Sequence, residues 1–198
     1  MMTGSDRNTL YPVFLKLREL NLLIVGGGET GLEKVSFILK NSPDANITLI
    51  GKEVDGRILK LTADYTSVIV LEKLFEVADL EDVNILILAT DNIALDIEIK
   101  EQAKRKNILV NVADKPGLCD FYLGSIVSKG NLKIGISTNG KSPTLAKRIR
   151  EYLQEGLPDN TDELIANLGE IRDKLTGGLK EKIIALNEIT SSFKNKNE

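Results

Sequence analysis

Three glycines that follow a short apolar run have the clearest chemical meaning in this sequence. The run Leu22-Leu23-Ile24-Val25 leads directly into Gly26, Gly28 and Gly31, which have the spacing G-x-G-x-x-G. In this setting the first glycine makes a tight turn, the second admits a pyrophosphate to the backbone, and the third lets a helix pack on the strand. Amides at the helix start then face the phosphates. A mononucleotide phosphate loop would need Lys-Ser or Lys-Thr after the last glycine, and Leu32-Glu33 stands there, so the pattern predicts a dinucleotide.

The residues after the next apolar run, 47–50, bear on which dinucleotide is bound. Folds of this kind usually place an Asp or Glu there, and it bonds the ribose hydroxyls of the adenosine. Here the stretch is Gly51-Lys52-Glu53, so the acid comes late, and Lys52 could instead approach a 2′-phosphate. Solvated loop charges explain both side chains equally well. The residues alone therefore leave the choice between NAD and NADP open.

A carboxylate, Asp114, follows the apolar run 108–112 in the stretch Asn111-Val112-Ala113-Asp114-Lys115-Pro116. A carboxylate at the end of a strand that faces a cofactor is a candidate general base or metal contact. An Asp shortly before a proline is also common in turns, and local sequence alone slightly favours that structural interpretation. Both interpretations of Asp114 therefore stand at this point.

The segment 137–143, Ser-Thr-Asn-Gly-Lys-Ser-Pro, is rich in hydrogen-bond donors and leads into a predicted helix, an arrangement suited to an anion. A basic stretch overlaps and follows it, in a chain whose net charge is -3. A substrate with several carboxylates would use such a stretch well, whereas a solvated helix face is the ordinary alternative. The basic residues, which precede Glu151 with no acid among them, are Lys141, Lys147, Arg148 and Arg150.

Alternating strand and helix patterns supply the framework for these residues. Helical periodicity follows the glycines and returns over residues 93–106. The apolar runs that predict strands are 22–25, 47–50, 68–71, 85–90 and 108–112. This alternation predicts an α/β fold of the Rossmann type, with a doubly wound parallel sheet. Ligands of such sheets bind at the carboxyl ends of the strands, which places Thr90, Asp91 and Asp114 beside the glycine turn.

The pattern changes after this sheet. Residues 125–129 and 132–137 predict an antiparallel hairpin around a Lys-Gly-Asn turn. The chain is predicted to be helical from Ser142, with Pro143 in the first helical position. Two further helices are predicted from apolar stripes at Leu164, Ile165, Leu168, Ile171 and Leu175 and at Leu179, Ile183, Leu186 and Phe193.

The hairpin and the helices also predict how the chain is divided and assembled. A lone hairpin is marginal in water, so a second copy of the chain is the expected partner, in a homodimer. We therefore predict three regions along the sequence. They are a NAD-binding Rossmann domain over 1–113, a small α+β dimerisation and substrate-binding region over 114–150, and a C-terminal helical region over 151–198.

The composition of the 198 residues excludes several kinds of chemistry. The absence of histidine removes the Ser-His-Asp triad and every imidazole metal site. The single cysteine, Cys119, excludes an internal disulfide and a multi-thiolate metal cage. The net charge argues against a surface built to bind nucleic acid. Neither a membrane span nor a signal-peptide pattern is found, so we expect a cytoplasmic protein with no membrane partner.

Several segments between residues 11 and 151 together carry a family resemblance. They are Tyr11-Pro12-Val13-Phe14, the run from Leu23 to Glu29, Leu88-Ala89-Thr90-Asp91-Asn92, Asn111-Val112-Ala113-Asp114, Cys119-Asp120-Phe121 and the run from Ile136 to Ala146. In this order they resemble the precorrin-2 dehydrogenases of sirohaem synthesis, including the N-terminal half of the multifunctional sirohaem synthases. The resemblance implies NAD-dependent oxidation of the tetrapyrrole precorrin-2 to sirohydrochlorin in a homodimer.

The resemblance also implies roles for individual residues. It makes Asp114 the key carboxylate and Thr138 the hydroxyl of the substrate loop, and it accounts for the basic stretch because precorrin-2 carries many carboxylates. Together with the strand-end argument, it gives the expected cofactor contacts as Gly26, Gly28, Glu29, Thr30, Gly31, Lys52, Glu53, Thr90 and Asp91. The expected substrate contacts are Asn111, Thr138, Asn139, Gly140, Lys141, Ser142 and Arg148.

Two questions stay open on the sequence. Many members of this family also insert ferrous iron into sirohydrochlorin. The lack of histidine removes the soft nitrogen ligand that iron favours, whereas a carboxylate such as Asp114 could accept pyrrole protons or hold a hard cation. The second question is whether the chain is instead a non-catalytic Rossmann module that senses NAD(P) and regulates a partner. A sensor would have no need of a donor-rich, basic segment at 136–150.

Overall fold

The computed structural model describes residues 7–190, which fall into two compact units. The first unit consists of the residues up to Gly124 together with Ser137–Ser142, and the second of Ser125–Ile136 together with the residues from Pro143. Phe193, which belongs to a predicted apolar stripe, lies outside the described residues, as do the outer ends of the predicted regions 1–113 and 151–198.

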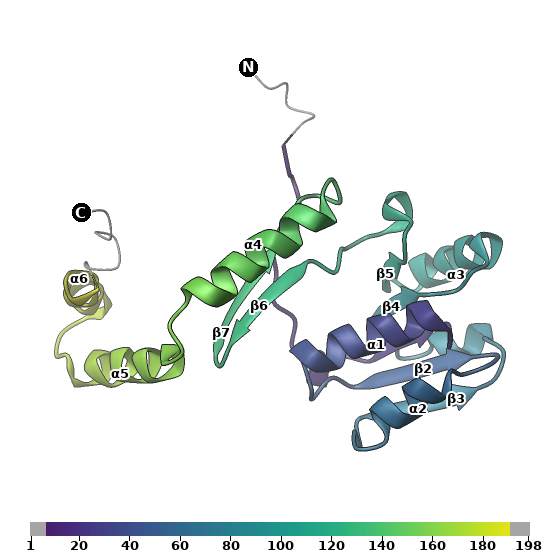
Figure 1. Cartoon of the computed structure of the whole chain (residues 1–198), viewed down its shortest axis with the longest axis horizontal. Helices are drawn as coiled ribbons and strands as arrows, with labels where there is room; N and C mark the ends of the chain where they lie inside the picture. Colours follow the sequence, from purple (N-terminus) through teal and green to yellow (C-terminus); the bar gives the residue numbers. More distant parts are fainter. Residues whose placement is uncertain (1–6, 191–198) are drawn as a thin grey trace. The chain divides into compact units, whose positions relative to one another are not determined.

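The first unit is built on a five-stranded parallel sheet with the order β3-β2-β1-β4-β5 (Figure 1). The strands are β1 (Leu22–Val25), β2 (Ile47–Gly51), β3 (Val68–Glu72), β4 (Ile85–Leu88) and β5 (Leu109–Val112). All residues of β1 and β4 are buried, as is usual for parallel strands that are covered on both faces. The order reverses between β1 and β4, which confirms the predicted doubly wound sheet.

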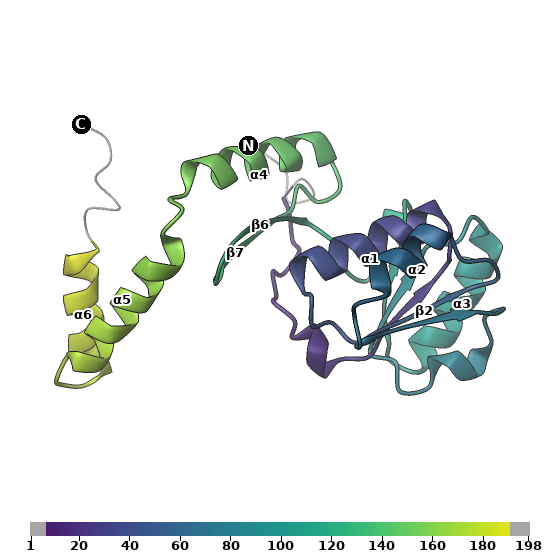
Figure 2. The same cartoon turned by 60° about the horizontal axis from the view of Figure 1, so that its bottom comes forward.

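Helices cover both faces of this sheet (Figures 1 and 2). On one face, α1 (Glu29–Asn41) and α2 (Gly56–Thr62) pack over Leu22 and Ile24 of β1. On the other face, α3 (Ile93–Arg105) packs over Leu23 and Val25 of the same strand. Alternate side chains of β1 therefore belong to two separate hydrophobic clusters, and the buried strand holds the two helix layers together.

Short elements complete the first unit. They are the 3₁₀ turns η2 (Leu17–Glu19), η3 (Val77–Leu80) and η4 (Pro116–Leu118). Asn92 caps α3 by accepting bonds from the backbone N–H groups of Ala94 and Leu95, and Asp55 caps α2. The sequence patterns did not predict α2, because a helix of seven residues has too few apolar positions to show a period.

The second unit begins with the antiparallel hairpin of β6 (Ser125–Lys129) and β7 (Leu132–Ile136), as predicted. Gly130 has φ +53° in the tight turn, where a glycine has no Cβ penalty. α4 (Pro143–Gly156) begins at the predicted proline and packs on β6. α5 (Thr161–Lys174) and α6 (Leu179–Ile189) follow. None of the helices in the described part of the chain has the length and apolar character needed to span a membrane.

Side-chain hydrogen bonds fix the start of α5 against the hairpin. Lys129 donates to the carbonyl of Leu157 at 2.7 Å and pairs with Asp159 at 2.6 Å, which lowers the pKa of that carboxyl. The backbone N–H of Asn131 donates to Asp162 at 2.6 Å. The hairpin therefore serves as the platform for the first two helices of the second unit.

Candidate functional site

Parallel pairing brings the carboxyl ends of four strands to one edge of the sheet. Val25 of β1 is in register with Ile50 of β2 and with Leu88 of β4, and Leu88 is in register with Val112 of β5. The loops that follow these strands therefore meet at the same edge. They carry the predicted cofactor residues Gly26, Gly28, Glu29, Thr30, Gly31, Lys52, Glu53, Thr90 and Asp91 and the carboxylate Asp114.

Two of the three motif glycines are required by the packing of the chain itself. Gly26 has φ +129°, and a Cβ on it would lie 2.2 Å from the carbonyl oxygen of Ala89. A Cβ on Gly31 would lie 2.0 Å from the carbonyl oxygen of Gly26. Contacts this short exclude any side chain, so these two glycines bring α1 against the ends of β1 and β4.

Gly28 is different, because nothing in the protein requires a glycine there. A Cβ on Gly28 would have no heavy atom within 4 Å. Gly28 caps α1 without a side-chain hydrogen bond, so the first amides of this 13-residue helix have no side-chain acceptor at that position. A bound pyrophosphate would use both the open space and the amides. The residues present therefore fit a dinucleotide at this turn.

The loop after β2 packs directly on the glycine turn. The N–H of Asp55 donates to the carbonyl of Gly27 at 2.8 Å, and a Cβ on Gly27 would lie 2.2 Å from the carbonyl oxygen of Glu53. The side chains of Lys52 and Glu53 are exposed and form no ion pair in the part of the chain that the structure describes. The charged contact at this loop is made instead by Arg57, which the sequence analysis did not select.

Thr90 lies at the edge where these loops meet, but its hydroxyl has partners inside the protein. Its Oγ1 lies 2.6 Å from Oδ1 of Asp96 and accepts a bond from the N–H of Asn92. Asp96 is buried in the first turn of α3, whereas Asp91 is exposed. Thr90 thus shapes the turn between β4 and α3, which ends β4 at Leu88 rather than at the predicted residue 90. Asp96 was not predicted from the sequence, because its spacing from Thr90 is the only local feature that indicates the bond between them.

Burial raises the pKa of the Asp96 carboxyl, although the hydrogen bond from Thr90 acts in the opposite direction. With this raised pKa, the folded chain holds a proton that the unfolded chain releases, so the contribution of Asp96 to stability is lost as the pH rises through that pKa. We expect Asp96→Asn to remove this contribution. The free energy of unfolding of the variant, relative to wild type, should therefore increase as the pH rises from about 4 towards neutrality.

Urea unfolding at a series of pH values measures this difference. Glu98→Gln is the matched control, because it removes an exposed carboxylate from the same helix. A difference between Asp96→Asn and wild type that does not vary with pH would contradict the expectation.

Asp114 follows β5 in the left-handed region, with φ +57°. Asp and Asn tolerate this conformation better than other residues with a side chain, which agrees with the turn interpretation. The Asp114 side chain is exposed and has no hydrogen bond or ion pair within residues 7–190. The carboxylate at this edge is therefore accessible to a ligand, and the backbone geometry leaves both interpretations standing.

The predicted substrate residue Asn111 and the thiol of Cys119 hold the segment that follows β5. The buried Asn111 amide donates to the carbonyl of Phe121 at 2.8 Å. Cys119 Sγ contacts the backbone N and O of Val112 at 3.3 Å and 3.2 Å. Burial raises the pKa of this thiol, which keeps it neutral. Asn111 and Cys119 therefore stabilise the turn that carries Asp114.

The predicted substrate loop is a tight turn closed by its own hydrogen bonds. Thr138 Oγ1 accepts a bond from the N–H of Ser142 at 3.2 Å, and the N–H of Lys141 donates to the carbonyl of Thr138 at 3.0 Å. Asn139 and Gly140 have φ +55° and +72°, a combination that Asn-Gly adopts readily. Thr138, Asn139, Gly140, Lys141 and Ser142 all belong to the first unit, and Arg148 belongs to the second.

The basic residues of α4 surround one acid. Glu151 lies 2.9 Å from Arg148, 3.8 Å from Arg150 and 4.0 Å from Lys147. Exposed pairs of this kind contribute little to stability, and three cations around one carboxylate leave a positive surplus. The guanidinium of Arg148 is largely exposed on this helix, so it is available to an anionic ligand.

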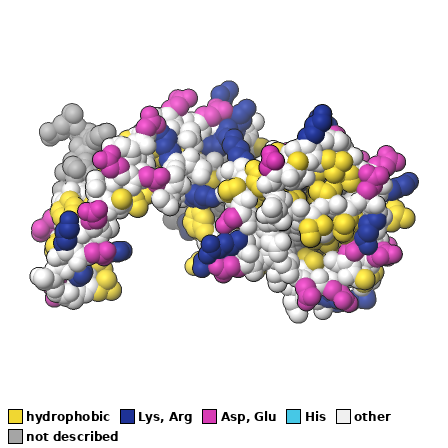
Figure 3. Space-filling model, turned by 90° about the horizontal axis from the view of Figure 1, so that it is seen from below, with side chains coloured by type: hydrophobic (Ala, Val, Ile, Leu, Met, Phe, Trp, Pro, Cys, Tyr) yellow, Lys and Arg dark blue, Asp and Glu magenta, His cyan; other side chains and the backbone are white. Residues whose placement is uncertain are grey.

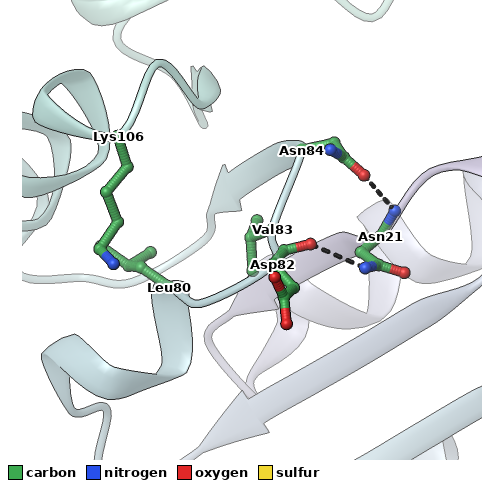
Figure 4. A pocket seen from close by; sticks show the side chains of 6 residues that line it. All are labelled: Asn21, Leu80, Asp82, Val83, Asn84 and Lys106. Atoms are coloured by element: carbon green, nitrogen blue, oxygen red, sulfur yellow. Dashed lines mark hydrogen bonds between the residues drawn. The ribbon is translucent and has the colours of Figure 1, made fainter.

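No group of three or more acidic or cysteine side chains in the described residues is arranged to hold a metal ion. An open pocket is lined by Asn21, Leu80, Asp82, Val83, Asn84 and Lys106 (Figure 4). Asn21 and Asn84 immediately precede β1 and β4, so this pocket lies at the edge of the sheet opposite the glycine turn. The Asn21 side-chain amide donates to the carbonyl of Asp82 at 2.7 Å, which gives Asn21 a structural role.

Comparison with known proteins agrees with this geometry. Residues 13–125 match a family described as putative NAD(P)-binding, and residues 129–155 match the family described as sirohaem biosynthesis protein central. The solved structure of SirC, a precorrin-2 dehydrogenase, is similar with a TM-score of 0.71 and 28% identity. That similarity covers 91% of this chain and 89% of SirC.

Two siroheme synthases are among the curated relatives. That of Ruthia magnifica subsp. Calyptogena magnifica is 37% identical over 164 residues, and that of Methylococcus capsulatus is 34% identical over 170 residues. The matches cover 83% and 86% of this chain but 34% and 35% of the relatives, so the chain spans about a third of their length. The chain therefore belongs to the putative NAD(P)-binding family, and it is similar to siroheme synthases and to the precorrin-2 dehydrogenase SirC.

Proposed function

We propose that this protein is an oxidoreductase that oxidises precorrin-2 to sirohydrochlorin with NAD in sirohaem synthesis. The observation that carries the proposal is Gly28, whose open space and uncapped helix amides suit a pyrophosphate in a chain similar to SirC along most of its length. NAD supplies the hydride acceptor when it is bound. Gly26 and Gly31 hold the turn in place, and the amides at the start of α1 bind the phosphates.

Asp114 is the proposed catalytic carboxylate. Oxidation of precorrin-2 transfers a hydride to NAD and releases a proton, so a base near the reacting carbon assists the step. The sequence has no histidine, and Asp114 is an exposed carboxylate at the cofactor edge of the sheet. We propose that Asp114 accepts the proton and that Asn111 and Cys119 position its turn. Thr138 and the other residues of 138–142 are proposed to bind the substrate.

Lys141 and Arg148 are proposed to bind carboxylates of precorrin-2. We expect the double variant Lys141→Ala, Arg148→Ala to raise KM for precorrin-2 about tenfold and to leave the affinity for NAD nearly unchanged, since each exposed ionic contact contributes roughly 0.2–1 kcal/mol. Salt should reproduce part of this effect in the wild type, because exposed charges are screened.

Steady-state kinetics with varied precorrin-2, together with calorimetric titration of NAD, measures both quantities. Lys180→Ala is the control, since it removes an exposed lysine from α6. If the double variant keeps the wild-type KM, the basic residues of α4 are an ordinary solvated helix face.

A regulatory module that senses NAD(P) is the alternative function. It would share the glycine turn but would have no use for the donor-rich loop and basic helix at 136–150. Incubating the protein with NAD and precorrin-2 while recording the pigment spectrum separates the two. Conversion of the pigment to sirohydrochlorin supports the dehydrogenase, whereas NAD binding without any spectral change supports the sensor.

Iron insertion into sirohydrochlorin is a further activity that the family resemblance implies, with ferrous iron as a substrate. Asp114 is the proposed carboxylate for this step as well, since it could accept the pyrrole protons. Adding ferrous iron to enzymatically formed sirohydrochlorin tests this. A sirohaem spectrum that appears faster with the wild type than with Asp114→Asn or without protein would support iron insertion. Equal rates in the three reactions would contradict it.

We further propose that the protein is a homodimer in the cytoplasm and that it is divided functionally at residues 113 and 150. Large apolar side chains are exposed in each unit, on α2 and the edge strand β3 of the first unit and on α4 of the second. Figure 3 shows hydrophobic side chains gathered on one face of the first unit. On α4, Leu145, Ile149 and Tyr152 recur at helical spacing and support a role for this face in the dimer. Sedimentation equilibrium should give the mass of a dimer, and a monomer would contradict the proposal.

A further inference from the structure

Three charged side chains at the glycine turn form a group that we call the Arg57 cluster. It consists of Arg57 at the start of α2, Asp55 in the loop after β2, and Glu29 in the first turn of α1. Arg57 Nη2 lies 2.6 Å from Asp55 Oδ2 and 2.5 Å from Glu29 Oε2. Arg57 Nε donates to both oxygens of Asp55 at 3.1 Å. One guanidinium therefore joins carboxylates from two segments that are distant in the sequence.

Backbone contacts fix the Arg57 cluster beside the proposed cofactor site. The N–H of Asp55 donates to the carbonyl of Gly27 at 2.8 Å, and Glu29 follows Gly27 by two residues. A Cβ on Gly51 would lie only 2.7 Å from the backbone N of Gly27. The end of β2 and the glycine turn are thus packed backbone against backbone. This is the place where folds of this type hold the ribose of the adenosine.

The cluster has a net negative charge, since it contains two carboxylates and one guanidinium. The side-chain hydrogen bonds from Arg57 hold the pKa of Asp55 at about 2, so this carboxylate is ionised at neutral pH. The side chains of Arg57 and Glu29 are 57% and 77% exposed, so a ligand can reach them. Asp55 is only 25% exposed, and it occupies one side of the arginine fork.

NADP differs from NAD by a phosphate on the 2′-hydroxyl of this ribose. An arginine accommodates such a phosphate when its paired N–H donors are free to bind it. In the Arg57 cluster the donors on Nε and Nη2 are used on Asp55 and Glu29, so a phosphate would find no free pair that includes either nitrogen, and the surplus carboxylate would repel it. We propose that the Arg57 cluster selects NAD over NADP. This inference rests on the proposed function, because it takes the glycine turn as the dinucleotide site.

Variants of the cluster should shift the preference in opposite directions. Glu29→Gln with Asp55→Asn removes both negative charges, frees Arg57, and retains a good cap for α2, because Asn caps as well as Asp. We expect the Kd for NADP to fall about tenfold relative to the Kd for NAD. Arg57→Ala leaves the carboxylates without their cation, so the Kd for NADP should rise about fivefold relative to that for NAD.

Calorimetric titration of both dinucleotides against the whole chain measures these constants, and thermal melting checks that each variant is folded. The single variant Glu29→Gln, at an exposed position, should shift the preference in the same direction by a smaller amount. Glu33→Gln is the matched control, because it removes an exposed acid from the same helix outside the cluster. Higher salt should weaken the preference of the wild type for NAD.

The outcomes separate this inference from the proposed function. The role of the cluster would be overturned if Glu29→Gln and the double variant both kept the wild-type preference between NAD and NADP. It would also be overturned if Arg57→Ala shifted the preference in the same direction as the double variant. Either result would leave the proposed dehydrogenase function intact. A wild type that binds NADP more tightly than NAD would overturn it as well. A wild type that binds neither dinucleotide would overturn the proposed function and this inference together.

Discussion

Replacing Gly28 with valine should abolish NAD binding while leaving the chain folded. A Cβ on Gly28 would have no heavy atom within 4 Å, so we expect the fold to be retained. The same side chain would occupy the space proposed for the pyrophosphate and would block its approach to the amides of α1. We expect a loss of affinity of at least about 100-fold, or about 2.8 kcal/mol. Calorimetric titration with NAD and thermal melting measure the two effects.

Gly26→Val is the informative comparison, because it changes the same motif with the opposite consequence. Its Cβ would overlap the carbonyl of Ala89, and φ +129° is strained for any residue with a side chain. We expect this variant to lose about 3 kcal/mol or more of folding stability. If Gly28→Val instead bound NAD as tightly as the wild type, the glycine turn would not be the cofactor site.

Asp114→Asn should lower the turnover of precorrin-2 by about 100-fold or more, which is the usual scale for a lost general base. Asparagine keeps the size of the side chain and tolerates φ +57°, so the turn after β5 should remain. The substitution therefore separates the catalytic interpretation from the turn interpretation. Steady-state kinetics at saturating NAD measures turnover, and thermal melting should show little change in stability.

Asp82→Asn is the matched control for this prediction. Asp82 is also an exposed aspartate with a positive φ, 59°, but it lines the pocket at the opposite edge of the sheet. Its substitution should leave turnover unchanged. Wild-type turnover in Asp114→Asn would show that another group or water takes the proton, and that Asp114 only shapes its turn.

The sheet could be predicted from the sequence because its strands are buried on both faces. A strand such as 85–88 is then apolar at every position, and the glycine turn marks where the first helix begins. The ends of elements were harder to predict, since they depend on side-chain hydrogen bonds. Thr90 was predicted to extend β4, but its bonds to Asp96 and Asn92 start the turn into α3.

The sequence could predict that the loops with the proposed cofactor residues meet at one edge of the sheet, but it could not predict how their charges pair. Parallel register alone brings the loops after β1, β2, β4 and β5 together, so motif positions were sufficient to locate the edge. The pairing of Arg57 with Glu29 depends on how α2 packs beside α1, and no local spacing shows it. For the same reason, the sequence offered Lys52 and Glu53 as the charges of this loop, and the ion-paired Arg57 was not predicted.

The most direct test of the dehydrogenase is the stoichiometry of its products in a single reaction with NAD and precorrin-2. NADH and sirohydrochlorin are measured together by their absorbance, with the wild type and with Gly28→Val. We expect one NADH to form for each sirohydrochlorin with the wild type, and neither product to form above the protein-free rate with the variant. Sirohydrochlorin that forms without NADH, or NAD that binds without any oxidation of precorrin-2, would contradict the proposed function.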